Sequence, residues 1–510
     1  MSGANADLSA AWAYHDGTKH SPASVRGSRH TLDWTNQPLP FKIYTSLERL
    51  PLPRDLPPAD GPALTAIAGA APHHPGTGGL DPSMLARLGL YANGVTKVLR
   101  WPGGQMPFRA AACTGALYHV ELYFVCGPLP DLEAGVYHYA AHDHSLGRLR
   151  AGDFRSVVVE ATGAEPGVRA APVVAVLTST FWRNAWKYQA RAYRHSFWDT
   201  GTVVANLLAV ATAHHVAAHV VLGFADEAVD RLLDVDPSRE VAICLVALGR
   251  SPDEVAGSAA LPEPLGLATR PLSAREVDYP EIRAMHAASS LSSGAEAAAW
   301  RAFAGQGSLR PPRSLARSLT RSLKRAAGGI PIEEVILRRG SARRFTHEAI
   351  EREQLATMLE VATQPIDSDV AAAGPLSQPY LIVNAVSRLE PGSYVFHLGQ
   401  LVPLRLGSSR QVAGFLDLGQ ELAADAAVNV YWLSQLQPIL DRFGNRGYRA
   451  AQLEAAIQAG RLYLAAYALT LGATGLTFFD DEVTRFFSPH AAGKSVLFLM
   501  AVGQPARRGR

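Results

Sequence analysis

The sequence has few cysteines, little excess charge and no long apolar run. Its 510 residues contain three cysteines, Cys113, Cys126 and Cys244, without a Cys-x-x-Cys pair. This excludes a disulfide framework and fits a reducing compartment. The formal net charge of +3 gives no indication of nucleic acid binding. The N-terminus lacks a secretory signal pattern, and no apolar run reaches the roughly 18 residues of a membrane span. We therefore expect a cytoplasmic protein without a membrane or nucleic acid partner.

The chain is too long for one ordinary core, so its length predicts several domains. Residues 1–80 are rich in Pro, Gly and His and predict an extended N-terminal arm. Residues 81–270 and 330–510 predict two folded domains, joined by an Ala-, Ser- and Arg-rich linker over 271–329. A solvated linker is the favoured interpretation of its basic residues, and a basic helix that binds an acidic partner is the alternative. These basic residues are Arg310, Arg313, Arg317, Arg321, Lys324 and Arg325.

Apolar periodicity predicts the main helices and strands of both domains. Helices are expected at residues 82–93, 200–214, 352–362 and 447–471, with a further helix that opens at Pro331. Strands are expected at residues 118–125, 135–138, 145–150, 173–178, 241–249, 379–384, 392–397 and 496–503.

An internal repeat relates the two domains. Tyr193-Arg194 recurs as Tyr448-Arg449, 255 residues later, and Asp226-Glu227 recurs at the same spacing as Asp481-Glu482. Each copy continues from Tyr-Arg into a long helix, a short helix and an apolar strand that ends at glycine. A shared order over this length predicts two copies of one domain, packed together as a dimer within one chain.

An anion-binding pattern opens the second domain. Arg339, Ser341 and Arg343 alternate along the chain, so in an extended segment their side chains lie on one face. Two guanidiniums and a hydroxyl on one face can bind a phosphate. The segment Arg338-Arg339-Gly340-Ser341-Ala342-Arg343-Arg344-Phe345, followed by a helix and a strand, resembles the FMN-binding nitroreductase fold. The resemblance implies that Arg339, Ser341 and Arg343 hold the FMN phosphate and ribityl chain, with Arg338 and Lys494 as further basic residues there.

The first domain carries a different pair of motifs. Residues 110–117 form a loop of small side chains, which let the backbone approach a flat ligand closely. This loop and the Lys187-Tyr188-x-x-Arg191-x-Tyr193-Arg194 segment resemble the SagB/ThcOx-type dehydrogenases, a branch of the nitroreductase fold. Members of that branch oxidise azolines to azoles in ribosomally made peptides. The resemblance implies flavin contacts from Cys113, Thr114, Gly115, Ala116, Leu117, Arg191 and Asn206. The sequence departs from the pattern at Cys113, Thr114 and His119.

Each half lacks one of the two cofactor motifs, and the other half has it. The first half has no phosphate motif before its loop, and the second half has no small-residue loop at residues 364–378. In this fold the flavin lies at a dimer interface, so the resemblance implies an α+β chain of two tandem nitroreductase-like domains with mostly antiparallel sheets. It also implies one FMN per chain between the halves, with Thr477 and Phe478 near flavin N5. A further homodimer is possible.

The resemblance implies that Lys187 and Tyr188 are the catalytic pair. A lysine acts as a base only if its pKa falls toward neutrality, which burial and nearby cations achieve. We expect Arg191 to be such a cation, at i, i+4 on one helix. The second half has Arg442 and Phe443 at these positions, which cannot serve as a base or proton relay.

Three functional hypotheses follow from these motifs. The first is an FMN-dependent dehydrogenase of azoline rings in a peptide, with O2 as the acceptor and cyclodehydratase components as partners. The second is an NAD(P)H-dependent reductase of a small molecule. The third is a non-catalytic scaffold of a peptide-modifying complex. The sequence predicts no metal site, because His214, His215 and His219 lack a zincin pattern and a third ligand.

Overall fold

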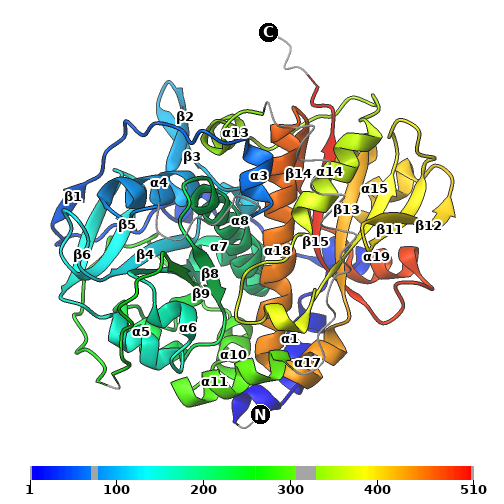
Figure 1. Cartoon of the computed structure of the whole chain (residues 1–510). Helices are drawn as coiled ribbons and strands as arrows, with labels where there is room; N and C mark the ends of the chain where they lie inside the picture. Colours follow the sequence, from blue (N-terminus) through cyan, green and yellow to red (C-terminus); the bar gives the residue numbers. More distant parts are fainter. Residues whose placement is uncertain (1–2, 70–77, 259, 306–328, 507–510) are drawn as a thin grey trace.

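Two antiparallel sheets with the same strand order form the two halves of the molecule (Figure 1). The computed structural model describes residues 3–69, 78–258, 260–305 and 329–506. The first sheet has the order β1-β6-β5-β4-β7-β9-β8, and the second has the order β12-β11-β10-β13-β15-β14. Apart from the edge strand β1, the two orders correspond strand by strand. The predicted α+β fold with two tandem copies of one domain is therefore confirmed.

The strands of the first half are β1 (Arg49–Pro51), β2 (Val95–Trp101), β3 (Gly104–Arg109), β4 (Val120–Cys126), β5 (Gly135–Ala140), β6 (Ser145–Ala151), β7 (Val173–Thr180), β8 (Ala218–Val221) and β9 (Glu240–Leu248). Strands β2 and β3 form a separate two-stranded hairpin. The strands of the second half are β10 (Gln378–Val383), β11 (Gly392–His397), β12 (Gln400–Leu406), β13 (Val428–Ser434), β14 (Gly472–Gly475) and β15 (Ser495–Gly503).

Helices cover both sheets. Those up to residue 305 are α1 (Ser9–Gly17), α2 (Pro22–Gly27), α3 (Ala63–Ile67), α4 (Pro82–Asn93), α5 (Arg155–Ala161), α6 (Pro166–Arg169), α7 (Phe181–Tyr188), α8 (Ala192–Ala213), α9 (Asp226–Leu232), α10 (Pro280–Ala288) and α11 (Gly294–Ala302). The later ones are α13 (Ile332–Arg338), α14 (Arg352–Ala362), α15 (Arg410–Leu416), α16 (Glu421–Asp425), α17 (Leu436–Phe443), α18 (Asn445–Ala468) and α19 (Asp480–Phe487). Short 3-10 turns are η1 (Ala4–Ala6), η2 (Trp34–Asn36), η3 (Thr114–Ala116), η4 (Gln189–Arg191), η5 (Phe303–Gly305) and η6 (Ala371–Ala373).

The long helices α8 and α18 stand side by side in the middle of the molecule (Figure 1). A Cβ on Gly201 would lie 2.4 Å from the Cβ of Ala456, and a Cβ on Gly460 would lie 2.6 Å from that of Ala205. In each pair the two residues are 255 positions apart, so each glycine faces its own equivalent. This is the geometry of a two-fold axis, and the glycines let the helices meet there.

The predictions for regular elements hold closely in the two domains. The helices predicted at residues 82–93 and 352–362 and the strand at 392–397 have the predicted bounds. The long helix predicted at residues 200–214 begins earlier, at Ala192. None of the described helices combines the length and the apolar character that a membrane crossing requires.

The arm and the linker differ from their predictions. Helices α1, α2 and α3 lie in the segment predicted to be extended, while Pro51 sits on an edge strand that pairs only with β6. Helices α10 and α11 occupy the start of the predicted solvated linker, where His286 and Trp300 are buried. Helices this short are held by tertiary contacts, which local propensity does not reveal. The basic residues from Arg310 to Arg325 lie outside the described residues.

Candidate active site

The small-residue loop of the first half joins β3 to β4 and is held by Asp199 of α8. The Asp199 carboxylate accepts hydrogen bonds from the Thr114 backbone N–H at 3.0 Å and the Thr114 hydroxyl at 2.7 Å. It also accepts one from the Cys113 thiol at 3.0 Å. Gly115, with φ of 61°, is exposed at the tip of the loop, beside the half-buried Ala116 and before the buried Leu117. The loop thus exposes backbone and small side chains, and Asp199 holds it in place.

Tyr188 points its hydroxyl at this loop. A Cβ on Gly115 would lie 3.0 Å from the Tyr188 hydroxyl oxygen, so glycine leaves room for it there. The Tyr188 ring packs edge-on against His195, with 4.4 Å between ring centroids. Burial, together with Asp199 and Cys113, raises the pKa of Tyr188 well above its usual value. The phenol therefore keeps its proton at neutral pH and is available as a hydrogen-bond donor.

Lys187, at the end of α7, is half-buried and lies within electrostatic range of Arg343 of the second half. Burial is the main cause that lowers the pKa of Lys187, and the Arg343 guanidinium lowers it further. The prediction that Arg191 supplies this cation was wrong. Gln189 has φ of 52°, which ends α7, so Lys187 and Arg191 do not share a helical face.

The predicted phosphate motif of the second half touches the loop of the first half. Arg339 donates through Nε to the Ala110 carbonyl at 2.8 Å and through Nη2 to the Arg109 carbonyl at 3.1 Å. The Ser341 hydroxyl accepts a hydrogen bond from Tyr463 at 2.9 Å. Arg343 is exposed and forms no ion pair with any described residue. The two motifs that the sequence separates by more than 200 residues therefore meet in one place.

Other predicted ligands are engaged in structural contacts. Arg338 pairs with Glu334 on the exposed face of α13. Lys494 donates to the Tyr380 hydroxyl at 2.6 Å and to Gln378, which joins β15 to β10. The Asn206 amide donates to the Tyr91 carbonyl at 2.9 Å, which joins α8 to α4. These three side chains are therefore already bonded within the protein.

Arg191 connects the Lys187 segment to the second half. Its guanidinium donates to Asp480 at 3.0 Å and stacks on Trp198 and on Phe478, with 5.3 Å to the Phe478 ring centroid. Phe478 is buried, and Thr477 is half-buried in the turn between β14 and α19. The turn predicted to lie near flavin N5 is thus packed against Arg191 and Trp198, in the segment that follows Lys187 and Tyr188.

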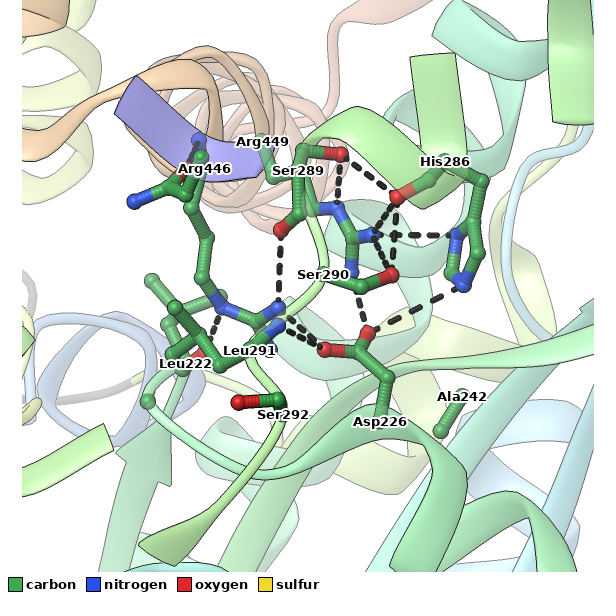
Figure 2. A network of polar contacts seen from close by, with 12 residues as sticks. Leu222, Asp226, Ala242, His286, Ser289, Ser290, Leu291, Ser292, Arg446 and Arg449 are labelled. Atoms are coloured by element: carbon green, nitrogen blue, oxygen red, sulfur yellow. Dashed lines mark hydrogen bonds and ion pairs between the residues drawn. The ribbon is translucent and has the colours of Figure 1, made fainter. Parts of the chain in front are cut away.

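An equivalent network lies on the other side of the axis (Figure 2). There Arg446 and Arg449 of α18 bind the two oxygens of Asp226, each at 2.6 Å. Arg449 also donates to the Ser289 hydroxyl at 2.8 Å and to the His286 carbonyl at 2.7 Å. Around Asp480, the matching partners of Arg194 are the Thr18 hydroxyl and the His15 carbonyl.

The arm and the linker therefore supply equivalent parts of the two networks. His15 lies in the last turn of α1 and Thr18 directly follows it, while His286 lies in the last turn of α10 and Ser289 directly follows it. Sequence reasoning missed this role because it treated both segments as connectors. The shared spacing, His-x-x-Thr in one and His-x-x-Ser in the other, is the signal that could have revealed it.

In the second half, residues of the linker segment cover the place that corresponds to Lys187 and Tyr188. Arg442 donates through Nε to the Phe303 carbonyl at 2.6 Å. Trp300 of α11 is 2% exposed, packs on the Phe443 ring and donates to the Phe443 carbonyl at 2.8 Å. The segment after α10 thus covers the residues that replace Lys187 and Tyr188 in the second half.

Comparisons with known proteins agree with this architecture. The model of the family described as "Nitroreductase family" matches residues 103–250 and 336–504, one region in each half. The chain belongs to the nitroreductase family. Family members are typically FMN-dependent oxidoreductases, so this chain is a flavin oxidoreductase by family.

Two nitroreductase relatives illustrate the match. A crystal structure of a "putative nitroreductase" from Anabaena variabilis is 27% identical, covers 98% of this chain and 99% of its own, and superposes with a TM-score of 0.75. The Methanocaldococcus jannaschii protein "Putative nitroreductase MJ1384" is 24% identical over 143 residues, which are 28% of this chain and 71% of that protein. The Anabaena protein therefore shares the whole two-domain arrangement.

The residues between the halves suit a bound FMN. Arg343 acts electrostatically on Lys187, and neither forms an ion pair with an acidic group in the described parts of the chain. Two neighbouring cations without a counter-charge repel each other, and a phosphate beside them would remove this repulsion. The exposed backbone at Gly115 offers a surface for a flat ring.

Proposed function

We propose that this protein is an FMN-dependent dehydrogenase of the SagB type, which oxidises an azoline ring, or a related site, in a ribosomally made peptide. The observation that carries the proposal is the position of Lys187 and Tyr188 of one half beside Arg343 of the other. Only the first half has an ionisable pair at this place, because Arg442 and Phe443 stand there in the second half. One FMN per chain, between the halves, follows from this asymmetry.

The proposed cofactor residues fall into two groups. Arg343, Arg339 and Ser341 would hold the phosphate end, and residues 113–117 with the Thr477-Phe478 turn would face the ring. FMN supplies a hydride acceptor when it is bound. Arg338, Lys494 and Asn206 would act through the packing of the surrounding elements, because their side chains bond to protein groups.

Lys187 is the proposed base of the reaction. Converting an azoline to an azole removes one hydride and one proton from the ring, and the proton passes to the neutral Nζ of Lys187. The lowered pKa of Lys187 increases the fraction of this neutral amine. Tyr188 keeps its own proton and donates a hydrogen bond that orients the substrate heteroatom. O2 is the proposed final oxidant, so the reaction needs no nicotinamide.

Family membership alone also fits an NAD(P)H-dependent reductase of a small molecule. The two functions differ in how the bound flavin becomes reduced. A reductase bleaches its flavin within seconds of mixing with NADPH or NADH under anaerobic conditions. The proposed dehydrogenase keeps an oxidised flavin in the same experiment and loses the colour when an azoline peptide is added. A non-catalytic scaffold would give a colourless protein.

The test combines a spectrum with matched variants. The full-length protein is purified, reconstituted with FMN and examined by visible absorption. We expect one bound flavin per chain and at least a 100-fold loss of azoline oxidation in Lys187→Ala, with flavin binding retained. Arg442→Ala, at the equivalent place in the other half, is the control and should keep its activity. A protein that binds no FMN after reconstitution would exclude both enzymatic functions.

A further inference from the structure

Three side chains of metal-binding type converge beneath the small-residue loop. The ligand atoms of Cys113, His119 and Asp199 all lie within 4.8 Å of one another. His119 Nε2 lies 2.7 Å from Asp199 Oδ2, and Cys113 Sγ lies 3.0 Å from the same oxygen. Cys113 and His119 are also two of the positions at which the loop departs from the SagB/ThcOx pattern.

We propose that Cys113, His119 and Asp199 bind a divalent metal ion of Zn²⁺ type, which ties the flavin-facing loop to α8. Thiolate, imidazole and carboxylate are the three ligand types that protein zinc sites combine. In a tetrahedral site, metal–ligand bonds of about 2.0–2.3 Å separate neighbouring ligand atoms by about 3.3–3.5 Å. The two distances to Asp199 therefore need to lengthen by only about 0.5 Å.

Charge balance favours an ion at this place. Asp199 is 4% exposed, and among the described residues no lysine or arginine forms an ion pair with it. Hydrogen bonds from Thr114 and Cys113 and the contact with His119 hold this carboxylate, and a dication beside it would add the opposite charge that a buried carboxylate favours. One metal dication with the Asp199 carboxylate and a Cys113 thiolate is neutral overall. The ion replaces the proton that the Cys113 thiol donates to Asp199, and this proton leaves to solvent.

The surroundings already orient the proposed ligands. His119 Nδ1 bonds to the Ser179 hydroxyl at 2.8 Å, which leaves Nε2 directed at Asp199. The Tyr118 backbone N–H donates to Cys113 Sγ at 3.0 Å, a contact that also stabilises a thiolate. The nearby Arg109 guanidinium donates to the Val120 and Pro40 carbonyls. These contacts orient Cys113 and His119, while Asp199 would exchange its contacts with Cys113 and His119 for the metal and keep those from Thr114.

A small cavity adjoins two of the three proposed ligands. Cys113 and Asp199 line a small cavity together with Asn93, Arg109 and Tyr118. Three protein ligands and one open position suit a metal that keeps one exchangeable ligand. Asp199 also holds Thr114, the residue before Gly115, so the ion would fix the loop that the proposed flavin ring faces.

Cobalt substitution tests the proposal independently of the flavin. The untagged full-length chain, freed of metal and FMN, is titrated with Co²⁺, whose thiolate complexes absorb in the near ultraviolet. We expect this band to saturate at one Co²⁺ per chain and to disappear in Cys113→Ser, whose hydroxyl can still donate to Asp199. His119→Asn should weaken binding at least ten-fold. Cys126→Ala and Cys244→Ala, which change the other two cysteines, should keep the band.

The opposite results are equally clear. The absence of a band in the folded wild-type protein, with and without FMN, would leave a hydrogen-bonded cluster and overturn the proposal. A band that persists in Cys113→Ser would place the metal elsewhere and also overturn it. Circular dichroism of each variant confirms that the chain is folded. Because the readout is the cobalt–thiolate band, failure here leaves the proposed dehydrogenase function untouched.

Discussion

Arg449 and Asp226 form a buried ion pair across the two halves, with 2.6 Å between Nη1 and Oδ1. Arg194 and Asp480 form its counterpart, with 2.7 Å between Nη1 and Oδ1. Each half thus contributes an arginine to one network and an aspartate to the other. Such reciprocal contacts are those of a symmetric dimer, retained here within one chain. Because the two networks share no residues, a substitution in one of them, and in the proposed site beside it, leaves the residues of the other unchanged.

The first prediction compares the two aspartates. Asp226→Ala leaves Arg446 and Arg449 buried without a carboxylate, which we expect to destabilise the fold by about 3–5 kcal/mol. Asp480→Ala should destabilise it to a similar extent, through Arg191 and Arg194. The thermal unfolding midpoint of each variant gives this comparison.

Only one of these substitutions should affect the bound cofactor. Asp480 holds Arg191, which stacks on Phe478 in the turn near the proposed flavin, whereas Asp226 lies in the other network. The visible spectrum and fluorescence of bound FMN should therefore change in Asp480→Ala and stay unchanged in Asp226→Ala. Equal spectral changes in both variants would contradict the asymmetry.

The repeat also shows how far sequence comparison alone can go. The ungapped spacing of 255 residues matches Asp226 to Asp481, because each is followed by Glu. In the structure the equivalent residue is Asp480, which is 3% exposed and binds two arginines, whereas Asp481 pairs with Lys19 at the surface. A shift of one residue in a loop is invisible to spacing, and burial decides which carboxylate is the partner.

The sequence predicted the motifs of the candidate site, but not all of the contacts between them. The Arg339-Ser341-Arg343 motif and the Lys187-Tyr188 segment could be identified from the sequence, because each is a compact local pattern. The cation that acts on Lys187 could not, since Gln189 at positive φ ends the helix before Arg191, and Arg343 comes from the other half of the chain. Likewise, the spacing of His15 and Thr18 did not predict their role, because their contacts with Arg194 form only when α1 packs beside it.

The second prediction concerns the charge that acts on Lys187. Arg343→Gln removes a cation that disfavours the ammonium form, so the pKa of Lys187 should rise in the flavin-free protein. NMR titration of ¹³C-methylated lysines measures this value. Because the amine would then lose its proton at higher pH, less neutral Lys187 would be present at pH 8. Arg338→Gln, three residues before Ser341 and in a surface pair with Glu334, is the control and should leave the pKa of Lys187 unchanged.

The third prediction is a pH dependence of stability at Glu454. Glu454 is the second-half equivalent of Asp199 and accepts hydrogen bonds from the Leu376 backbone N–H at 2.7 Å and the Ser377 hydroxyl at 3.1 Å. Burial raises the pKa of Glu454 from 4.5 to about 7. The folded protein therefore holds this proton more tightly than the unfolded chain does.

The sign follows from this difference. As the pH rises from 4.5 to 7, the unfolded state loses the proton first, so the contribution of Glu454 to stability falls. Relative to Glu454→Gln, the wild type should lose at most about 3 kcal/mol across this window. Urea unfolding of both proteins at pH 5 and pH 8 measures the change. Glu353→Gln, at an exposed carboxylate paired with Arg388, should show no such dependence.

The fourth prediction addresses the number of flavins. Trp300 covers the second-half equivalent of the Lys187-Tyr188 site and is 2% exposed, so Trp300→Ala should destabilise the fold by about 3–5 kcal/mol. The variant should nevertheless bind one FMN per chain, because Arg442 and Phe443 stand where Lys187 and Tyr188 stand in the first half, and the small-residue loop is absent. Trp300→Phe keeps an aromatic ring but loses the hydrogen bond to the Phe443 carbonyl, and is the milder control. Flavin absorbance divided by protein concentration gives the ratio. A ratio of two in Trp300→Ala would mean that α11 alone closes an otherwise competent second site, and that the two halves have not lost complementary parts of it.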